Sequence, residues 1–238
     1  METVIVFDMD GVLAEVTESY RQAIVETVDH FTGRRIARDL IQDYKNQGGW
    51  NNDWSLSQKI AADLGVEVPY ETVVEQFNRF FLGENGDGEG GLIQRETWFP
   101  EAGLLERLSE RYALSLFTGR LKYEAEITLR RFAPSITFDP MVCAEHVTNS
   151  KPAPDGLLDI QRARPGSQFL YVGDTVDDAR AASAARVPFI GIVAAGHSRR
   201  DKILELFDRE NAVAVVENVN EIEPVLENAT KTVKETGT

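Results

Sequence analysis

Short apolar runs alternate with longer amphipathic segments along most of this chain. The runs are rich in β-branched and aliphatic residues and cover residues 3–7, 113–117, 141–144, 169–172, 189–193 and 212–216. The amphipathic segments include residues 102–112, 123–132, 178–185 and 201–207. Continuous apolar strands separated by helices are typical of a parallel sheet that is buried on both faces. The sequence therefore predicts an α/β fold with a parallel sheet flanked by helices.

One interval between the expected strands is much longer than the others. About a hundred residues separate the first strand from the second, whereas a crossover helix with its loops needs far fewer. Within this interval apolar residues recur at helical spacing in three places, and almost nothing resembles a strand. These positions are Tyr20, Ile24, Val28 and Phe31; Ile60, Ala61 and Leu64; and Val73, Val74, Phe77, Phe80 and Phe81. We therefore predict a core formed by residues 1–14 and 96–238, with an all-helical domain inserted at residues 15–95.

The charge balance limits the partners of this protein. The formal net charge of the 238 residues is −14, which disfavours nucleic acid and anionic membrane surfaces as partners. No apolar run approaches the roughly 20 residues needed to cross a bilayer. A single cysteine, Cys143, excludes an intrachain disulfide, and we expect it to be a small core residue of a cytoplasmic protein. An acidic protein that binds an anionic small molecule must supply positive charge locally, from a cation or a few basic side chains.

Pairs of aspartates follow two of the expected strands. Asp8 and Asp10 come after the first strand, and Asp174 and Asp178 come after the strand at residues 169–172. Ligands of open parallel sheets bind at the carboxyl ends of the strands, near the point where the strand order reverses. Carboxylates gathered there repel one another unless a cation binds, and Mg²⁺ prefers oxygen ligands. The sequence predicts a magnesium site at this edge.

Further candidate residues are expected at the same edge. Thr118, Gly119 and Arg120 follow the second strand, and Lys151 precedes the helix that leads to the strand at residues 169–172. Arg120 has two equally good interpretations, as a group that contacts a substrate phosphate or as a solvated residue at the start of a helix.

In order along the chain, these residues resemble the four motifs of the haloacid dehalogenase-like hydrolases. The segment Asp8-Met9-Asp10-Gly11-Val12 resembles the first motif, and Thr118 and Lys151 resemble the second and third. Gly173-Asp174 together with Asp178 resembles the fourth. The resemblance covers the whole chain, and implies a Rossmann-like core with an inserted helical C1 cap, as in subfamily I of these hydrolases. The layout is similar to that of phosphoglycolate phosphatases.

The resemblance also implies a role for each motif residue. Asp8 would be the nucleophile that is transiently phosphorylated, and Asp10 would protonate the leaving oxygen and then deprotonate a water molecule. Thr118 would donate a hydrogen bond to the phosphoryl group, and Lys151 would neutralise developing charge. Gly119 and Arg120 are candidate substrate-binding residues. Mg²⁺ would be held by Asp8, Asp10 and Asp174, the second of these through its backbone carbonyl, with Asp178 as a direct or an outer ligand.

The inserted domain contains a polar, glycine-broken segment at residues 43–54. Lys45 and Trp54 within it are candidate substrate-binding residues, because caps of this family select the leaving group and a lysine suits an anionic one. The alternative is that the tryptophan packs inside the inserted domain and the asparagines and aspartates terminate helices.

The implied activity is Mg²⁺-dependent hydrolysis of a small phosphorylated metabolite. Asp10 argues against haloacid dehalogenases and phosphonatases, which lack the second acid of the first motif. Two alternatives stay open: a mutase similar to β-phosphoglucomutase, and a non-catalytic regulator that binds phosphate. The sequence does not indicate an oligomeric state.

Residues 85–96 carry a separate signal. Their oxygen-bearing side chains, with glycine at the sixth place and Glu96 at the twelfth, resemble a calcium-binding EF-hand loop. The match is imperfect, since Asn85 occupies a place that is usually Asp, and Glu89 occupies one that is usually Asp or Asn. A glycine-rich connection between the two domains explains the same composition without a metal.

Overall fold

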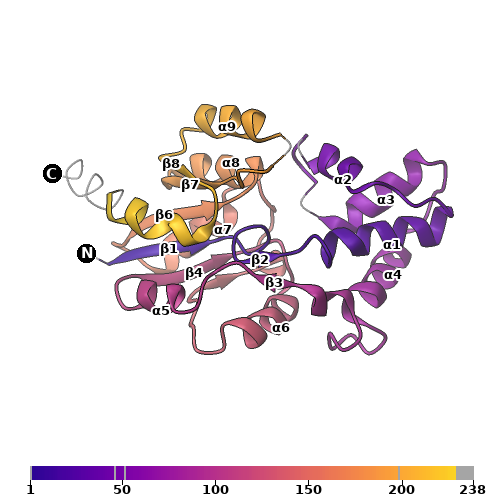
Figure 1. The fold of residues 1–238 in the computed structure, drawn as a ribbon, viewed down its shortest axis with the longest axis horizontal. Helices are drawn as coiled ribbons and strands as arrows, with labels where there is room; N and C mark the ends of the chain where they lie inside the picture. Colours follow the sequence, from indigo (N-terminus) through magenta and orange to yellow (C-terminus); the bar gives the residue numbers. More distant parts are fainter. Residues whose placement is uncertain (1, 46, 51, 198, 229–238) are drawn as a thin grey trace. The chain divides into compact units, whose positions relative to one another are not determined.

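A computed structural model describes residues 2–45, 47–50, 52–197 and 199–228. Its main feature is a six-stranded sheet in the order β5-β4-β1-β6-β7-β8, and the paired strands run parallel (Figure 1). The strands are β1 (Thr3–Phe7), β4 (Ala113–Phe117), β5 (Met141–Val142), β6 (Gln168–Gly173), β7 (Phe189–Ile192) and β8 (Ala214–Val216). The predicted α/β fold with a parallel sheet is confirmed.

The central position of β1 determines where the sheet can bind a ligand. All five residues of β1 are buried, as expected for a strand covered on both faces. From β1 the chain passes to β4 and β5 on one side, and then returns to β6, β7 and β8 on the other. The strand order therefore reverses at β1, so that the loops after β1, β4 and β6 meet at one edge.

Helices flank the sheet on both sides (Figure 1). They are α5 (Leu104–Ser109), α6 (Lys122–Phe132), α7 (Asp155–Ala163), α8 (Val176–Ala185) and α9 (Arg200–Arg209). Of these, α7 packs on β4 and β5, and α8 packs on β6 and β7. Several bounds differ from the prediction. Helix α5 starts only after Gly103, which has a φ of 85°, and ends earlier, and α8 starts earlier because Thr175 caps it.

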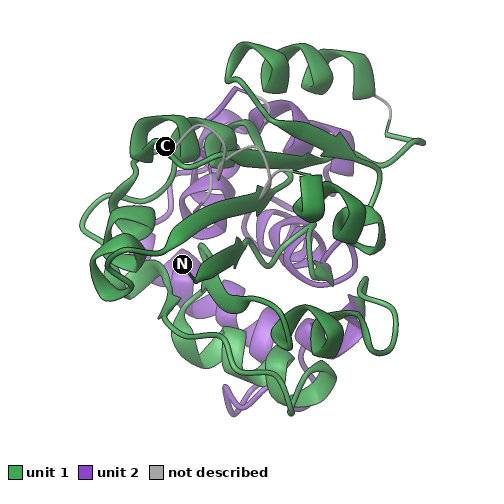
Figure 2. Cartoon of the chain, turned by 90° about the vertical axis from the view of Figure 1, so that its left-hand side faces the viewer, with its two compact units in different colours: residues 1–14, 98–238 green, residues 15–97 purple. Residues whose placement is uncertain are grey.

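The chain forms two compact units (Figure 2). Unit 1 contains residues 1–14 and 98–238, and unit 2 contains residues 15–97. The chain passes between them in two short strands that pair with each other, β2 (Ala14–Glu15) and β3 (Thr97–Trp98). Strands of two residues are too short to show an alternating pattern, which explains why the sequence did not indicate them.

Unit 2 is built from α1 (Tyr20–Thr32), α2 (Arg38–Lys45), α3 (Asp53–Asp63) and α4 (Tyr70–Leu82). The apolar faces of α1, α3 and α4 pack together, and Tyr20 and Phe81 place their ring centroids 4.0 Å apart. Helix α2 was not predicted, because it buries a single apolar side chain, Ile41. The side chain of Asn52 caps α3 by accepting a hydrogen bond of 2.8 Å from Ser55 N.

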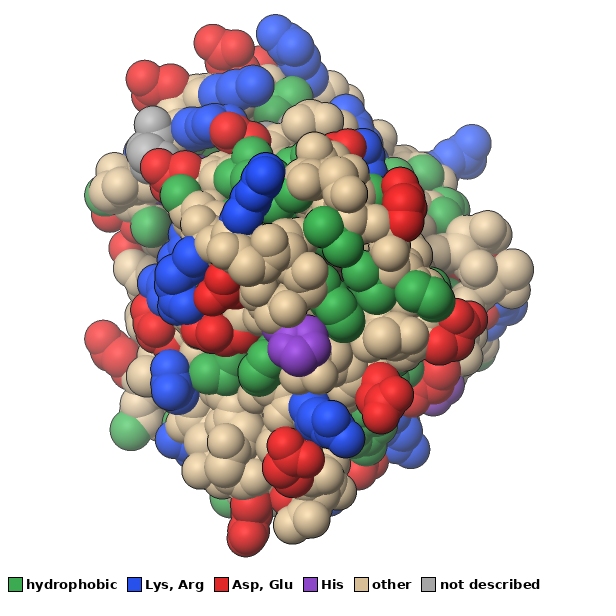
Figure 3. All heavy atoms as spheres, turned by 90° about the vertical axis from the view of Figure 1, so that its right-hand side faces the viewer, with side chains coloured by type: hydrophobic (Ala, Val, Ile, Leu, Met, Phe, Trp, Pro, Cys, Tyr) green, Lys and Arg blue, Asp and Glu red, His purple; other side chains and the backbone are tan. Residues whose placement is uncertain are grey.

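Charged residues of both signs are interspersed on the face of the molecule that Figure 3 shows. In unit 2, exposed ion pairs join Arg38 to Glu18 and Arg35 to Glu26. Such pairs are each worth only about 0–1 kcal/mol, so the helices depend on their buried faces for stability. In the part of the chain that the structure describes, no helix has the length and apolar character needed to span a membrane.

Candidate active site

Asp8 follows β1 directly and is almost completely shielded from water. Its backbone N–H donates to Val172 O at 2.8 Å, which continues the pairing of β1 with β6, and the residue is 6% exposed. Burial raises the pKa of the Asp8 carboxyl to about 7, although the Lys151 ammonium acts in the opposite direction. The negative charges of Asp178 and Asp10 raise this pKa further. A cation beside Asp8 would lower this pKa and so offset both the burial and the neighbouring negative charges.

Lys151 lies between two buried carboxylates. Its Nζ atom is 2.8 Å from Asp8 Oδ1 and 2.7 Å from Asp178 Oδ1, and its side chain is 4% exposed. The same atom lies 4.7 Å from the centroid of the Phe117 ring, within the range of a cation–π contact. Burial alone would lower the pKa of Lys151, but Asp178 and Asp8 raise it above the ordinary value. The lysine is therefore charged.

Asp178 uses both carboxylate oxygens for hydrogen bonds within the protein. Oδ1 accepts from Lys151 Nζ at 2.7 Å and from the Tyr171 hydroxyl at 2.6 Å. Oδ2 accepts from the backbone N–H and the hydroxyl of Thr175 at 3.0 and 2.5 Å. Burial raises the pKa of Asp178, but the charge and hydrogen bond of Lys151 hold it below the usual value. Four donors leave this carboxylate poorly placed to bind a metal ion directly, so it anchors the lysine.

Asp174 completes the acidic cluster. One carboxylate oxygen from each of Asp8, Asp174 and Asp178 lies within 4.8 Å of the others. A donor set made of carboxylates alone suits a hard cation such as Mg²⁺. Because both oxygens of Asp178 accept hydrogen bonds from the protein, Asp8 and Asp174 are better placed than Asp178 to hold the ion.

Gly11 allows Asp174 to approach the loop that carries Asp10. A Cβ atom built on Gly11 would lie 2.1 Å from Asp174 Oδ2, and the φ of 79° at Gly11 also disfavours other residues. The same loop is tightened by hydrogen bonds from Gly11 N to Ala14 O and from Ala14 N to Met9 O, both of 2.9 Å. The absence of a side chain at Gly11 in the first motif therefore makes room for Asp174 of the fourth motif.

Arg120 contacts Asp10, which the sequence did not suggest. Its Nε and Nη2 atoms lie 2.7 and 2.6 Å from Asp10 Oδ1, and its Nη1 atom donates to Thr128 Oγ1 at 2.7 Å. The guanidinium-bearing side chain is 0% exposed, so the interpretation as a solvated residue is wrong. Thr118, also buried, accepts at its hydroxyl from Arg120 N at 3.2 Å, and Gly119 is exposed in the same loop.

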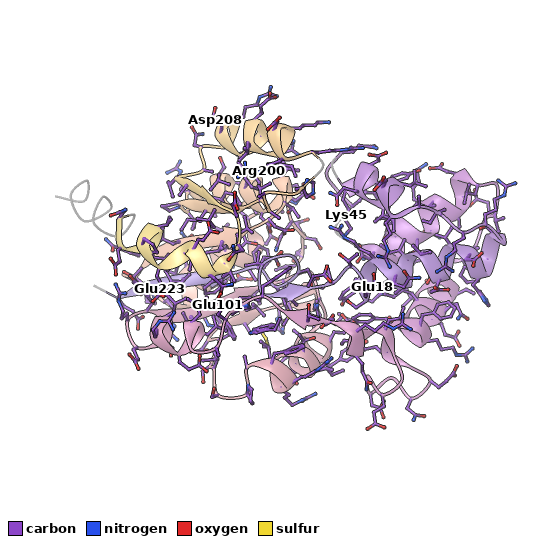
Figure 4. The ribbon with its side chains drawn as sticks, viewed as in Figure 1. Glu18, Lys45, Glu101, Arg200, Asp208 and Glu223 are labelled. Atoms are coloured by element: carbon purple, nitrogen blue, oxygen red, sulfur yellow. The ribbon has the colours of Figure 1, made fainter. Side chains whose placement is uncertain are left out.

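Lys45 and Trp54 belong to unit 2. Lys45 Nζ forms an ion pair of 2.7 Å with Asp53 (Figure 4 labels Lys45). The indole of Trp54 donates to Asn78 Oδ1 at 3.2 Å and packs edge-on against the Phe77 ring. The structure therefore gives each a structural contact within its own unit, and their contact with substrate stays a prediction.

Calcium binding by residues 85–96 stays a prediction, and the structure gives the closing residue a contact within the protein. The twelfth residue, Glu96, is buried and accepts a hydrogen bond of 3.2 Å from the Ser19 hydroxyl. The loop folds closely against the end of α4, since a Cβ atom on Gly91 would lie 2.4 Å from Phe81 O. Among the described residues, the one cluster of three possible metal ligands is that of Asp8, Asp174 and Asp178.

Two residues that support the site were missed at the sequence level. Thr175 lies three positions before Asp178, which is the spacing of a helix-capping box and could have been recognised. Tyr171 carries the one hydroxyl of the apolar run at residues 169–172, but its partner could not be deduced from that.

The sequence is similar to those of known proteins. The chain is 32% identical over 197 residues to a protein of Phytophthora nicotianae named imidazoleglycerol-phosphate dehydratase, covering 79% of this chain. It spans 43%, less than half, of that relative. It is also 25% identical over 195 residues to a phosphoglycolate phosphatase of Haemophilus influenzae, covering 78% of this chain and 83% of that protein.

A solved structure from Thermotoga maritima, assigned as a β-phosphoglucomutase, matches with a TM-score of 0.66 and 25% identity. The match covers 96% of this chain and 99% of that one. The sequence profile of the family described as haloacid dehalogenase-like hydrolase matches residues 5–192, from β1 through β7. This span includes each motif residue of the site and the helices of unit 2, which are the family's cap. The protein belongs to the haloacid dehalogenase-like hydrolases.

Proposed function

We propose that this protein is a Mg²⁺-dependent phosphatase that hydrolyses a small phosphorylated metabolite through a phosphorylated Asp8. The observation that carries the proposal is the buried contact of 2.8 Å between Asp8 Oδ1 and Lys151 Nζ, beside the carboxylate of Asp174. A carboxylate at the reversal point of a parallel sheet, next to a charged lysine, suits attack on a phosphoryl group, whose negative oxygens must be neutralised.

The proposed reaction has two steps. In the first, a carboxylate oxygen of Asp8 bonds to phosphorus while the bond from phosphorus to the ester oxygen breaks, and Asp10 gives its proton to that oxygen. In the second, Asp10 takes a proton from a water molecule, which attacks phosphorus and releases inorganic phosphate and the free carboxylate. Lys151 balances the charge of the phosphoryl oxygens in both steps, and the Thr118 hydroxyl donates a hydrogen bond to one of them.

Asp8, Asp174 and the backbone carbonyl of Asp10 would hold Mg²⁺, which when bound supplies positive charge to the phosphoryl oxygens. Asp178 contributes indirectly, because it fixes Lys151. Unit 2 would select the leaving group, with Lys45 and Trp54 as candidate contacts.

The names of the relatives guide the choice of substrates. Phosphoglycolate and an imidazole-bearing glycerol phosphate are the first compounds to test, since relatives of this chain are named for enzymes of these phosphorylated compounds. The likeness to a protein assigned as β-phosphoglucomutase keeps a phosphomutase as the second candidate. A mutase also needs an acid in the place of Asp10, but it interconverts sugar phosphates without net release of phosphate.

A phosphate-release screen of phosphorylated metabolites with Mg²⁺ tests the proposal, with Asp8→Asn as the control. We expect turnover of at least one ester, and a loss of about 10³-fold or more in Asp8→Asn, because removal of a nucleophile removes the covalent route. Circular dichroism should show that the variant is folded. Interconversion of sugar phosphates without phosphate release would select the mutase, and absence of both activities would favour a non-catalytic binding protein.

A further inference from the structure

We infer that Arg120 is a positioning residue, which holds Asp10 in place for proton transfer to and from the substrate. This inference rests on the proposed phosphatase function and extends it, because it assigns the arginine to the acid–base step. The alternative assignment is direct binding of a substrate phosphate by Arg120.

The geometry of the contact supports the positioning role. Nε and Nη2 of Arg120 both approach Oδ1 of Asp10, at 2.7 and 2.6 Å. In the described part of the chain these contacts occupy one oxygen of the carboxylate, whose side chain is 32% exposed, so the second oxygen can exchange a proton with a ligand. Proton transfer requires heavy atoms within about 2.6–3.2 Å of each other, which makes a fixed carboxylate valuable.

Arg120 itself is fixed from three sides. Its Nη1 atom donates to Thr128 Oγ1 in α6 at 2.7 Å, and its carbonyl accepts from Ala144 N at 2.9 Å. Its backbone N–H donates to the Thr118 hydroxyl at 3.2 Å. A fully buried guanidinium must keep its partners, because an unpaired charge in the interior is costly. Arg120 is therefore the rigid partner of the pair, and Asp10 is the partly exposed one.

The charge of Arg120 has a second consequence for the site. Asp10 and Asp8 lie two positions apart, so a negative charge on Asp10 disfavours one on Asp8. A guanidinium that contacts Asp10 balances this charge without occupying the nucleophile. The guanidinium commits Nε, Nη1 and Nη2 to groups of the protein, and a phosphate-binding arginine would instead direct its paired N–H groups toward the ligand.

The test uses esters whose leaving groups differ in basicity. An alkyl phosphate needs protonation of its leaving oxygen, whereas 2,4-dinitrophenyl phosphate does not. In Arg120→Met we expect kcat/KM to fall about 100-fold for the alkyl ester, the loss typical of a misplaced catalytic group, and less than about 10-fold for the dinitrophenyl ester. With the dinitrophenyl ester, phosphorylated Asp8 should accumulate in the variant, because the second step still needs Asp10 as a base.

Controls separate this role from a structural one. Arg164→Met removes another arginine that pairs with a carboxylate in unit 1, at 2.6 Å from Asp139, and should leave the dependence on leaving group unchanged. Arg120→Lys keeps a buried charge and should recover part of the alkyl-ester activity; it carries the test if Arg120→Met does not fold. Millimolar guanidinium added to Arg120→Ala should restore part of the same activity.

Two results would overturn the inference: equal losses of kcat/KM on both esters, or a KM that rises while kcat is unchanged. The latter is expected if Arg120 binds the substrate phosphate. Wild-type protein and Asp8→Asn are measured in parallel. If the wild type shows no turnover that depends on Asp8, both the proposed function and the inference are wrong. If the wild type shows such turnover, the Arg120 variants test the inference separately from the proposed function.

Discussion

Oδ1 of Asp178 lies 2.7 Å from Nζ of Lys151, and both side chains are almost entirely shielded from solvent. Asp178 is itself fixed at the start of α8, where Thr175 accepts from its backbone N–H and donates to its carboxylate. Lys151, which also contacts Asp8, is therefore positioned by the N-terminus of α8. Under the proposed function, the fourth motif would then divide two roles between its aspartates: Asp174 would bind the metal ion and Asp178 would position the lysine.

Asp178→Asn and Asp174→Asn should differ in their effect on Mg²⁺ binding. We expect Asp178→Asn to weaken Mg²⁺ binding about 10–100-fold, as an indirect contact does, and Asp174→Asn to abolish it. Asp178→Asn should also lose about 3–5 kcal/mol of unfolding free energy, because Lys151 loses one of its two carboxylate partners. Calorimetric Mg²⁺ titration and urea unfolding measure the two effects. Complete loss of binding in both variants would show that Asp178 is a direct ligand.

Tyr171→Phe should destabilise the protein without removing the site. The hydroxyl donates to the charged carboxylate of Asp178 at 2.6 Å, and a hydrogen bond of this type contributes about 1.5–3 kcal/mol. Urea unfolding gives the loss. Tyr112→Phe is the matched control, because that hydroxyl accepts a longer hydrogen bond, of 3.3 Å, from exposed Arg111, and its loss should cost less than 1 kcal/mol, roughly the lower end for such bonds. Equal losses in the two variants would contradict the assigned contact.

Gly11→Ala should impair Mg²⁺ binding more than stability alone explains. The added methyl group meets Asp174 Oδ2 at 2.1 Å, so the carboxylate must move away from the site. Gly33→Ala is a matched control, since Gly33 also has a positive φ, of 65°, but open space around its Cβ position. In both variants the free energy of unfolding should fall by about 1 kcal/mol, because alanine is strained at a positive φ. Normal Mg²⁺ affinity in Gly11→Ala would argue against the proposed ligand.

Lys45→Ala and Trp54→Ala should change which esters are preferred, while hydrolysis of a minimal phosphate ester stays near normal. The reason is that cap residues would contact the leaving group and not the phosphoryl centre. Lys59→Ala removes another lysine ion pair of unit 2, with Asp63, and should leave the preference unchanged. Relative kcat/KM values across the metabolite screen provide the measurement. A uniform loss on all esters would indicate that the two residues serve folding.

The sheet was predictable because its strands are continuous apolar runs, and the acidic cluster because its members lie in the segments after β1 and β6. Local sequence carries both signals. It carries no information about pairs that meet only in the folded chain, such as Arg120 with Asp10, which are 110 positions apart. For the same reason the sequence left Arg120 with two interpretations, and neither was a contact with Asp10.

Local signals also have limits in the inserted unit. Helix α2 buries one apolar side chain, so its sequence lacks the stripe that reveals α1 and α4. The resemblance of residues 85–96 to a calcium loop came from the order of residue types. In the fold, the closing Glu96 bonds to Ser19, 77 positions away, which no spacing rule could indicate.

The chain leaves and re-enters unit 1 at neighbouring points, where Phe99 N donates to Leu13 O at 2.9 Å. The eighty or so residues between them form an insertion whose two ends are adjacent. The pairing of β1 with β4 involves none of the inserted residues. An evolving gene could therefore lengthen, shorten or exchange this insertion without changing the sheet or the loops that follow β1, β4 and β6. Under the proposed function, the residues that choose the substrate and those that perform the phosphoryl chemistry would then be inherited as separate parts of one protein.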